Sequence, residues 1–80
     1  MDTFTDEVDG HEITVTPIEA RPGGGARLDV RSDDGRQWRL DITRQGNVDK
    51  VVTTWRDGQL ANLEEPDWLE YLLTRVAMHA

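Results

Sequence analysis

A regular alternation of apolar and polar residues on both sides of a short acidic turn constrains the fold of this chain more than any other feature. The alternating runs span residues 26–31 and 38–43, and the turn between them contains Asp33, Asp34 and Gly35. A period of two is typical of a β-strand that buries one face and exposes the other. The pattern therefore predicts an antiparallel hairpin whose apolar face belongs to the core.

The length of the hairpin loop follows from the same alternation, because residues directly opposite each other share a face of the sheet. A two-residue loop would place apolar Val30 opposite polar Gln37 and would mix the two faces. A three-residue loop, Asp33-Asp34-Gly35, removes this conflict and gives Gly35 the left-handed position of a type I turn followed by a bulge. The cross-strand pairs predicted with this loop are Val30 with Trp38, Leu28 with Leu40, Ala26 with Ile42, Asp29 with Arg39 and Arg27 with Asp41.

Further strands are expected on both sides of this hairpin. Residues 11–19 alternate in the manner of a strand, and Pro17, which cannot donate a ladder hydrogen bond, indicates an edge strand with a bulge. Gly46-Asn47 predicts a two-residue type II′ turn, and Asp57-Gly58 predicts a two-residue turn that leads into residues 59–63. The turn at Gly46-Asn47 would pair Ile42 with Val51, Leu40 with Thr53, Trp38 with Trp55 and Arg44 with Asp49.

A helix is expected at the C-terminal end of the chain. Pro66 suits a first helical turn, and the acidic residues around it complement the positive end of the helix dipole. Apolar residues then recur at helical spacing and form one stripe, made of Leu69, Leu72, Leu73, Val76 and Ala80. The predicted fold class is α+β: an antiparallel β-meander of four to five strands with one C-terminal α-helix packed on one face. We expect Trp38 and Trp55 on that face and Trp68 at the edge of the helical stripe.

The length of 80 residues corresponds to one small domain. Residues 1–10 are acidic and lack an apolar period, so we expect a flexible acidic N-terminal arm followed by a single small α+β domain at residues 11–80. Without cysteine, the chain has neither a disulfide nor a thiolate metal site. We expect a cytoplasmic protein with no membrane span, because no apolar run approaches about 18 residues and the N-terminus lacks the parts of a signal peptide.

The composition is strongly acidic and poor in lysine. The 16 Asp and Glu residues against nine Lys and Arg residues give a net charge of −7, and Lys50 is the only lysine. Such surfaces are typical of proteins from salt-loving archaea, in which carboxylates maintain solubility in brine and repel one another at low salt. A genome of high GC content, which favours Arg codons, is the alternative explanation. We interpret the composition as that of a halophilic cell.

No residue pattern predicts catalysis or a cofactor. His11 and His79 are far apart in the sequence and supply at most two of the three or four ligands that zinc needs. The acidic turn before Gly35 lacks the alternating carboxylates and the later Glu of a calcium loop. Ser32, the only serine, has no histidine in a suitable register. We therefore expect no enzyme, with no catalytic residue, no metal and no cofactor.

The polar face of the predicted sheet is the feature that bears most directly on function. It gathers basic side chains, whereas residues 1–20 carry six carboxylates and no Lys or Arg. Val52 and Leu63 are expected beside these basic residues and would supply the apolar centre of an interface. The predicted partner-binding residues are Arg27, Arg31, Arg39, Lys50, Arg56, Val52 and Leu63.

Two classes of function fit this face. The first, which we favour, is a small protein-interaction or regulatory module that docks an unidentified protein partner through the sheet face or the acidic surface, with a homodimer as an open alternative. The second is a nucleic-acid-binding domain that uses the Arg-rich face. Nucleic acid is the less favoured partner, because a net charge of −7 opposes phosphate and no aromatic residue is expected on that face to stack on bases.

Residues 63–72, with the sequence Leu-Glu-Glu-Pro-Asp-Trp-Leu-Glu-Tyr-Leu, follow the predicted strands and precede the helix. This segment resembles the strand-to-helix junction of the positive-cofactor family of single-stranded-DNA-binding coactivators. The resemblance implies four strands followed by a helix, dimerisation through that helix and binding of single-stranded DNA. The chain departs from the family pattern in two ways, since it has a surplus hairpin and lacks the basic arm.

Overall fold

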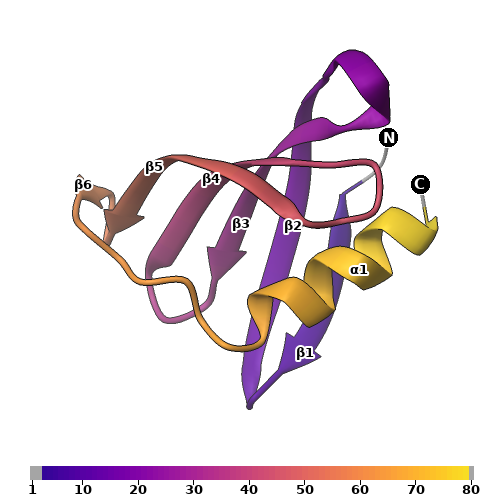
Figure 1. Ribbon diagram of the computed structural model, residues 1–80. Coiled ribbons are helices and arrows are strands. Elements are labelled where there is room, and N and C mark those ends of the chain that lie inside the picture. Colours follow the sequence, from indigo (N-terminus) through magenta and orange to yellow (C-terminus); the bar gives the residue numbers. More distant parts are fainter. Residues whose placement is uncertain (1–2, 80) are drawn as a thin grey trace.

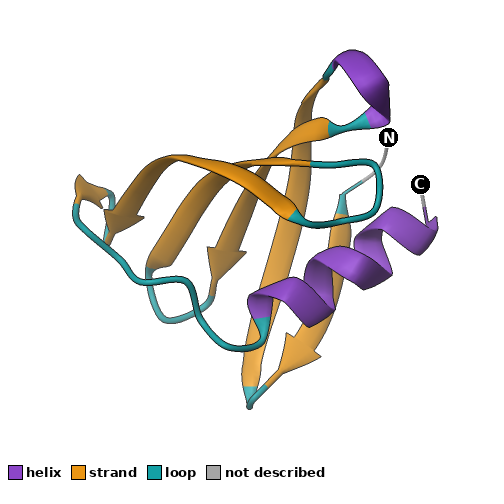
Figure 2. Cartoon of the chain, viewed as in Figure 1, coloured by secondary structure: helices purple, strands orange, loops and turns teal. Residues whose placement is uncertain are grey.

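The computed structural model describes residues 3–79, with His79 described by its backbone alone. Six strands form one antiparallel sheet in which every strand lies beside its neighbour in sequence, and one helix follows (Figures 1 and 2). The predicted α+β class and meander topology are confirmed, and the six strands exceed the four to five predicted. The elements are β1 (Phe4–Val8), β2 (His11–Ala20), the 3-10 turn η1 (Pro22–Gly24), β3 (Ala26–Ser32), β4 (Arg36–Ile42), β5 (Val48–Arg56), β6 (Gln59–Leu60) and α1 (Leu69–His79).

Strand β1 occupies most of the segment that we expected to be a flexible arm. It pairs along its whole length with β2, and the side chains of Phe4 and Val8 pack against the core. Asp9 and Gly10, with φ of 52° and 78°, adopt the left-handed conformation that a two-residue type I′ turn requires. The expectation of an arm is therefore corrected for residues 4–8, while residues 1 and 2 lie outside the described part of the chain.

Strand β2 is an interior strand of the sheet and not the predicted edge strand. β1 pairs with β2 only from His11 to Val15, so Pro17 lies beyond the end of β1 on a part of β2 that has a single strand neighbour. The predicted bulge is present, because the register of β2 against β3 shifts between Pro17 and Glu19.

The predicted hairpin of β3 and β4 is confirmed. Gly35 N–H donates to the Ser32 carbonyl at 3.2 Å, and Gly35 has a φ of 95°, as expected for a type I turn followed by a left-handed residue. All five predicted cross-strand pairs are present, including Val30 with Trp38 and the opposite-charge pair Asp29 with Arg39. The three-residue loop therefore sets one apolar and one polar face.

The predicted two-residue loop at Gly46-Asn47 is wrong. Gly46 N–H donates to the Thr43 carbonyl at 3.0 Å, and Thr43 N–H donates to the Asn47 carbonyl at 2.8 Å. The loop thus has three residues, with Gly46 in the third position at a φ of 90°. It repeats the design of the β3–β4 turn, in which the glycine is also third.

Two irregularities then shift the register of β5 against β4. Ile42 lies opposite Val48, and the next pair is Asp41 with Lys50, so Asp49 is bulged out. A regular ladder would have set Asp41 opposite Asp49, and like charges directly opposite destabilise a sheet. The bulge replaces this repulsion by an opposite-charge pair.

The second shift, between Arg39 and Leu40, reverses the alternation again, so Trp55 lies on the face that the three-residue loop alone would give it. Trp38 is opposite Thr54, and Trp55 is opposite Gln37. Because Gln37 and Trp38 point to opposite faces of β4, Trp55 lies on the face opposite Trp38. The predicted pairing of Trp38 with Trp55, and the placement of Trp55 in the core, are therefore wrong.

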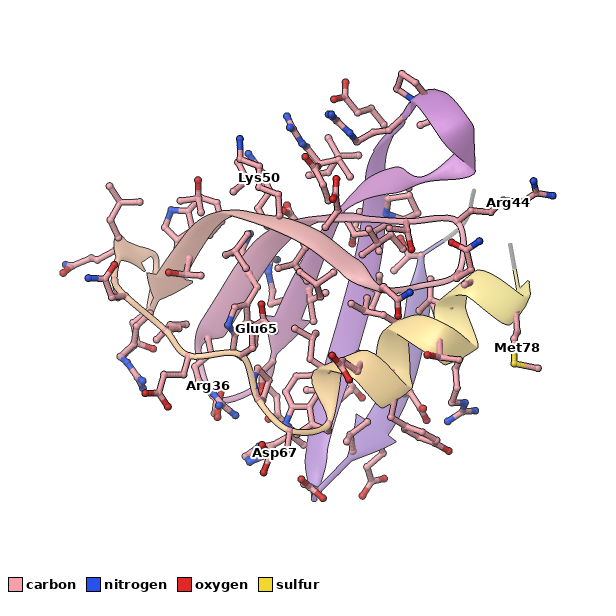
Figure 3. All side chains as sticks on the ribbon, viewed as in Figure 1. Arg36, Arg44, Lys50, Glu65, Asp67 and Met78 are labelled. Carbon is pink, nitrogen blue, oxygen red and sulfur yellow. The ribbon has the colours of Figure 1, made fainter. Side chains whose placement is uncertain are left out.

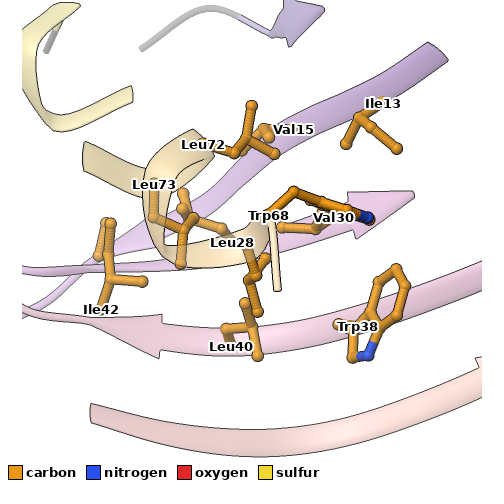
Figure 4. Packing of buried hydrophobic residues seen from close by; sticks show 12 residues of the cluster. Ile13, Val15, Leu28, Val30, Trp38, Leu40, Ile42, Trp68, Leu72 and Leu73 are labelled. Carbon is orange, nitrogen blue, oxygen red and sulfur yellow. The ribbon is translucent and has the colours of Figure 1, made fainter. Parts of the chain in front are cut away.

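Helix α1 covers the face that carries Trp38. Leu69 N–H donates to the Pro66 carbonyl at 3.1 Å, so Pro66 lies in the turn that precedes the helix. Trp68 in this turn is 8% exposed, and its ring meets that of Trp38 edge-on with 5.7 Å between centroids. Figure 4 shows the cluster that results, which consists of Ile13, Val15, Ala26, Leu28, Val30, Trp38, Leu40, Ile42, Trp68, Leu69, Leu72 and Leu73.

The helical stripe is confirmed at its first three positions, which are buried, and Val76 packs against the core while partly buried. Ala80 lies outside the described residues. The second core tryptophan of this protein is thus Trp68 and not Trp55.

Candidate partner-binding face

One face of the sheet is covered by α1. None of the described elements covers the opposite face, which we call the outer face (Figure 1). Strand registers place most of its side chains in three rows that cross the sheet, and Glu7 opposite Glu12 forms a further pair at the β1–β2 end. The first row contains Thr5, Thr14, Arg31, Gln37, Trp55 and Leu60. The second contains Thr16, Asp29, Arg39 and Thr53, and the third contains Glu19, Arg27, Asp41 and Lys50.

Two of the predicted binding arginines, Arg27 and Arg39, form bidentate ion pairs within the outer face. Arg27 Nε and Nη2 donate to the two carboxylate oxygens of Asp41 at 2.8 and 3.1 Å. Arg39 binds Asp29 with the same two distances. Charge-assisted pairs of this geometry are strong. Arg27 and Arg39 therefore stabilise the sheet, and much of their hydrogen-bonding capacity is already used by Asp41 and Asp29.

Asp41 is the centre of the third row. It is 2% exposed, and Arg21 Nη1 also lies 3.6 Å from its carboxylate. The hydrogen bonds from Arg27 hold the pKa of Asp41 below its usual range, with Arg21 and Lys50 acting in the same direction. The same hydrogen bonds raise the pKa of Arg27. A buried carboxylate with this set of neighbours stays ionised and fixes the arginine positions.

Arg31 and Lys50 are the outer-face cations that remain available to a partner. Both are exposed, and neither forms an ion pair within 3–79. Figure 3 shows Lys50 on the side of β5 that points away from α1. On β3–β5 the rows hold four basic and two acidic side chains, whereas β1 and β2 contribute the carboxylates of Glu7, Glu12 and Glu19 to the same face. The positive charge of the outer face is therefore local to β3–β5, on a protein whose net charge is −7.

Trp55 supplies the aromatic group that sequence reasoning did not place on this face. The Arg39 guanidinium lies 5.3 Å from the centroid of its ring, within cation–π distance. Leu60, opposite Trp55 on β6, is 76% exposed. Trp55 and Leu60 therefore form an apolar pair at the β6 end of the first row, next to the basic side chains of β3–β5.

Arg56, predicted on the outer face, lies on the other side of the sheet. It is opposite Arg36 across the β4–β5 ladder, and the Arg36 guanidinium lies 5.3 Å from the ring centroid of the core residue Trp38. The two arginines line a hollow together with the acidic residues Glu64, Glu65 and Asp67, some of which are labelled in Figure 3. Arg56 is therefore removed from the predicted patch.

Leu63 and Val52 were predicted to form the apolar centre of the interface. Leu63 packs against the core, and its N–H donates to Thr54 Oγ1 at 3.3 Å. Val52 is half-buried and lines a groove at the edge of β5. Leu63 thus lies on the helix side, and Leu60 occupies the exposed position that we had predicted for Leu63.

Other chemistry is sparse in the described part of the chain. Residues 3–79 contain no group of three His, Asp or Glu side chains arranged to hold a metal. His11 Nδ1 lies 2.9 Å from Asp33 Oδ1 in an exposed pair. Within the same range, no helix combines the length and apolar character needed to cross a bilayer.

Comparisons with protein-family models, curated proteins and solved structures found no match for this chain. The six strands before α1 also differ from the four strands that the resemblance of residues 63–72 implies.

Sequence reasoning missed three residues of the candidate site, which are Gln37, Trp55 and Leu60. The turn at Gly46 contained a signal for their position. Applying the three-residue rule of the β3–β4 turn to Gly46 would have corrected the start of β5. The bulges that follow have no equally clear mark in the sequence.

Proposed function

We propose that this protein is a non-enzymatic interaction module of the cytoplasm of a halophilic cell, and that it docks an acidic partner protein through its outer face. The observation that carries the proposal is the row of Arg31, Gln37, Trp55 and Leu60 on a face that the fold does not use. Tryptophan and arginine are the residue types that dominate the binding energy of protein interfaces.

The groups of this row are held in place before any partner arrives. Arg39 is fixed by Asp29 and lies over the Trp55 ring, so the ring has a defined orientation. A preorganised aromatic side chain loses little conformational freedom on binding, which favours affinity. Leu60 is largely exposed and gains most from being covered.

The free guanidinium of Arg31 and the free ammonium of Lys50 favour carboxylates on the partner. A planar guanidinium pairs with a carboxylate through two parallel hydrogen bonds. Electrostatic screening limits the influence of the net negative charge, since the Debye length is about 8 Å at physiological ionic strength and about 3 Å at 1 M salt. At such distances a partner responds to the local positive charge of the outer face.

A second candidate function, binding of single-stranded nucleic acid, gains one observation from the structure. Trp55 lies on the Arg-bearing face, where a base could stack on it. Against this candidate, Trp55 is the only aromatic residue in the three rows, and the net charge of −7 repels a phosphate chain. We therefore place protein before nucleic acid.

The test is capture of partners from an extract of the source cells at their own salt concentration, with and without nuclease. Arg31→Glu should abolish recovery of the partner protein. Arg44→Glu is the matched control, because it makes the same change of charge at an exposed residue of the β4–β5 loop, away from the rows (Figure 3). Equal recovery with wild type and Arg31→Glu would refute the proposal, and nuclease-sensitive recovery alone would support the second candidate.

A further inference from the structure

The outer edge of β5 is only partly paired. β6 is two residues long and lies opposite Trp55 and Arg56, and the backbone contact that follows is a 3.1 Å hydrogen bond from Ala61 N–H to the Thr54 carbonyl. The chain then leaves β5 and turns toward α1 (Figure 1). Within the described chain, residues 48–53 therefore have no strand on this side. Unpaired strand edges are templates for an additional strand.

A groove follows this open edge. Its volume is about 570 Å³, and it is lined by Val51, Val52, Thr53, Thr54, Leu60, Ala61, Asn62 and Leu63. None of these eight residues is charged, although charged residues make up 31% of the chain. Val51 is 38% exposed and Leu60 is 76% exposed, so the groove offers apolar surface to a ligand.

Basic residues stand at both ends of the groove on β5. Lys50 precedes the lining residues of the strand, and Arg56 follows them after Trp55. Both side chains are exposed, and neither forms an ion pair among residues 3–79. An extended segment along the open edge would bring one end close to Lys50, so a carboxylate at that end complements the site. Arg56, in contrast, lies beside β6 on the helix side of the sheet, near Glu64, Glu65 and Asp67.

Resting on the proposed function, we propose that the edge of β5 from Val51 to Thr53 accepts an extended segment of the partner protein as an added strand, with apolar residues in the groove and Asp or Glu near Lys50. Strand addition takes affinity from main-chain hydrogen bonds and specificity from pockets for alternate side chains. Leu60 lines the groove and also belongs to the first row, so the edge is continuous with the outer face.

A second copy of the chain is a poorer occupant than an acidic segment of another protein. The bulges of β5 interrupt the regular edge, and bulges at edges oppose pairing between identical sheets. Two copies would also bring together two net charges of −7. The bulges and the contact of Ala61 with Thr54 limit an added strand to the short stretch beside Val51–Thr53.

The experiment selects peptides from a random octapeptide library on the immobilised full chain and measures their affinity for variants. Selected peptides should alternate apolar residues and carry Asp or Glu at the end that lies beside Lys50. Val52→Asp should weaken binding by about tenfold or more, which corresponds to 1.4 kcal/mol. The isosteric Val52→Thr should keep binding within about threefold. Gln45→Asp, in the exposed β4–β5 loop outside both the groove and the rows, is the control for added charge and should leave affinity unchanged.

Amide hydrogen exchange of the wild-type complex gives an independent readout, because an added strand should slow exchange within Val51–Thr53. The inference is overturned if no peptide is selected, if Val52→Asp binds as well as wild type, or if protection appears elsewhere. Its failure is distinct from failure of the proposed function. Loss of peptide binding in Val52→Asp with full partner capture by Arg31→Glu would keep the edge site and reject the outer face. The opposite result would keep the outer face and reject the edge site.

Discussion

Replacing Trp68 with alanine tests whether Trp68, and not Trp55, is the second tryptophan of the core. Trp68 is 8% exposed and packs edge-on against Trp38. A buried aromatic side chain removes about 150–250 Å² from water, which at about 25 cal/mol per Å² amounts to about 4–6 kcal/mol. Measured costs of Trp→Ala in cores are about 3–5 kcal/mol.

This loss is large against the whole stability of the protein. Domains gain about 0.05–0.15 kcal/mol per residue, or about 4–12 kcal/mol for a chain of this length. We expect Trp68→Ala to lower the urea midpoint by about 2 M or more, since small proteins have slopes of about 1–3 kcal/mol/M. Circular dichroism during urea titration at constant salt measures this shift. Because Trp68→Ala could be largely unfolded, Trp68→Phe, expected to cost about 1–3 kcal/mol, provides a folded comparison.

Trp55→Ala is the matched control on the opposite face. Trp55 is half-buried and contacts the Arg39 guanidinium, a contact worth about 0.5–1 kcal/mol at an exposed site. We expect a loss of at most about 1 kcal/mol, smaller than that of either Trp68 variant. If Trp55→Ala destabilised the fold as much as Trp68→Ala, the register of β5 described above would be refuted.

Three further outcomes are expected. Gly46→Ala should lower the free energy of unfolding, measured by chemical denaturation, by about 1–3 kcal/mol, because its Cβ would lie 2.7 Å from the Leu73 carbonyl oxygen at a φ of 90°. Gly58→Ala, with open space around the new Cβ, should lose less. Equal losses would contradict the packing of the β4–β5 loop on α1. The free energy of unfolding should fall as the pH drops from about 4 toward 2. In the folded state, hydrogen bonds hold the pKa of Asp41 low and that of Asp34 at about 2. The folded state therefore loses stabilisation as the pH falls below the unfolded pKa of these groups and they become protonated. Asp41→Asn should show a smaller fall, and an unchanged acid profile would count against this assignment. The melting temperature should rise steadily between about 0.1 M and multi-molar KCl, beyond the range of ordinary screening, and a flat curve would contradict the halophilic interpretation.

The sequence alone determined those features that depend on neighbours in the chain. The β3–β4 hairpin has apolar alternation, opposite-charge pairs and a glycine in the third turn position, and all three signals require the same register. The amphipathic stripe of α1 is equally local. The turn at Asp9-Gly10 carried the same kind of information, so β1 was predictable although we expected an arm.

The tertiary structure decided the register of β5 and, with it, the composition of the outer face. Two bulges bring Val51 opposite Leu40, because the first reverses the alternation of β5 and the second restores it before Trp55. One bulge avoids a like-charge pair with Asp41, a partner that lies on another strand.

The three-residue loop before β5 set Trp55 outward, since the two bulges cancel before Trp55 is reached, and the core position beside Trp38 was left to Trp68. A tryptophan is apolar enough for either place, so its own residue type does not choose between them. The choice depends on where the turn before α1 brings Trp68 and on the volume left beside Trp38, both of which exist only after the sheet and helix have packed.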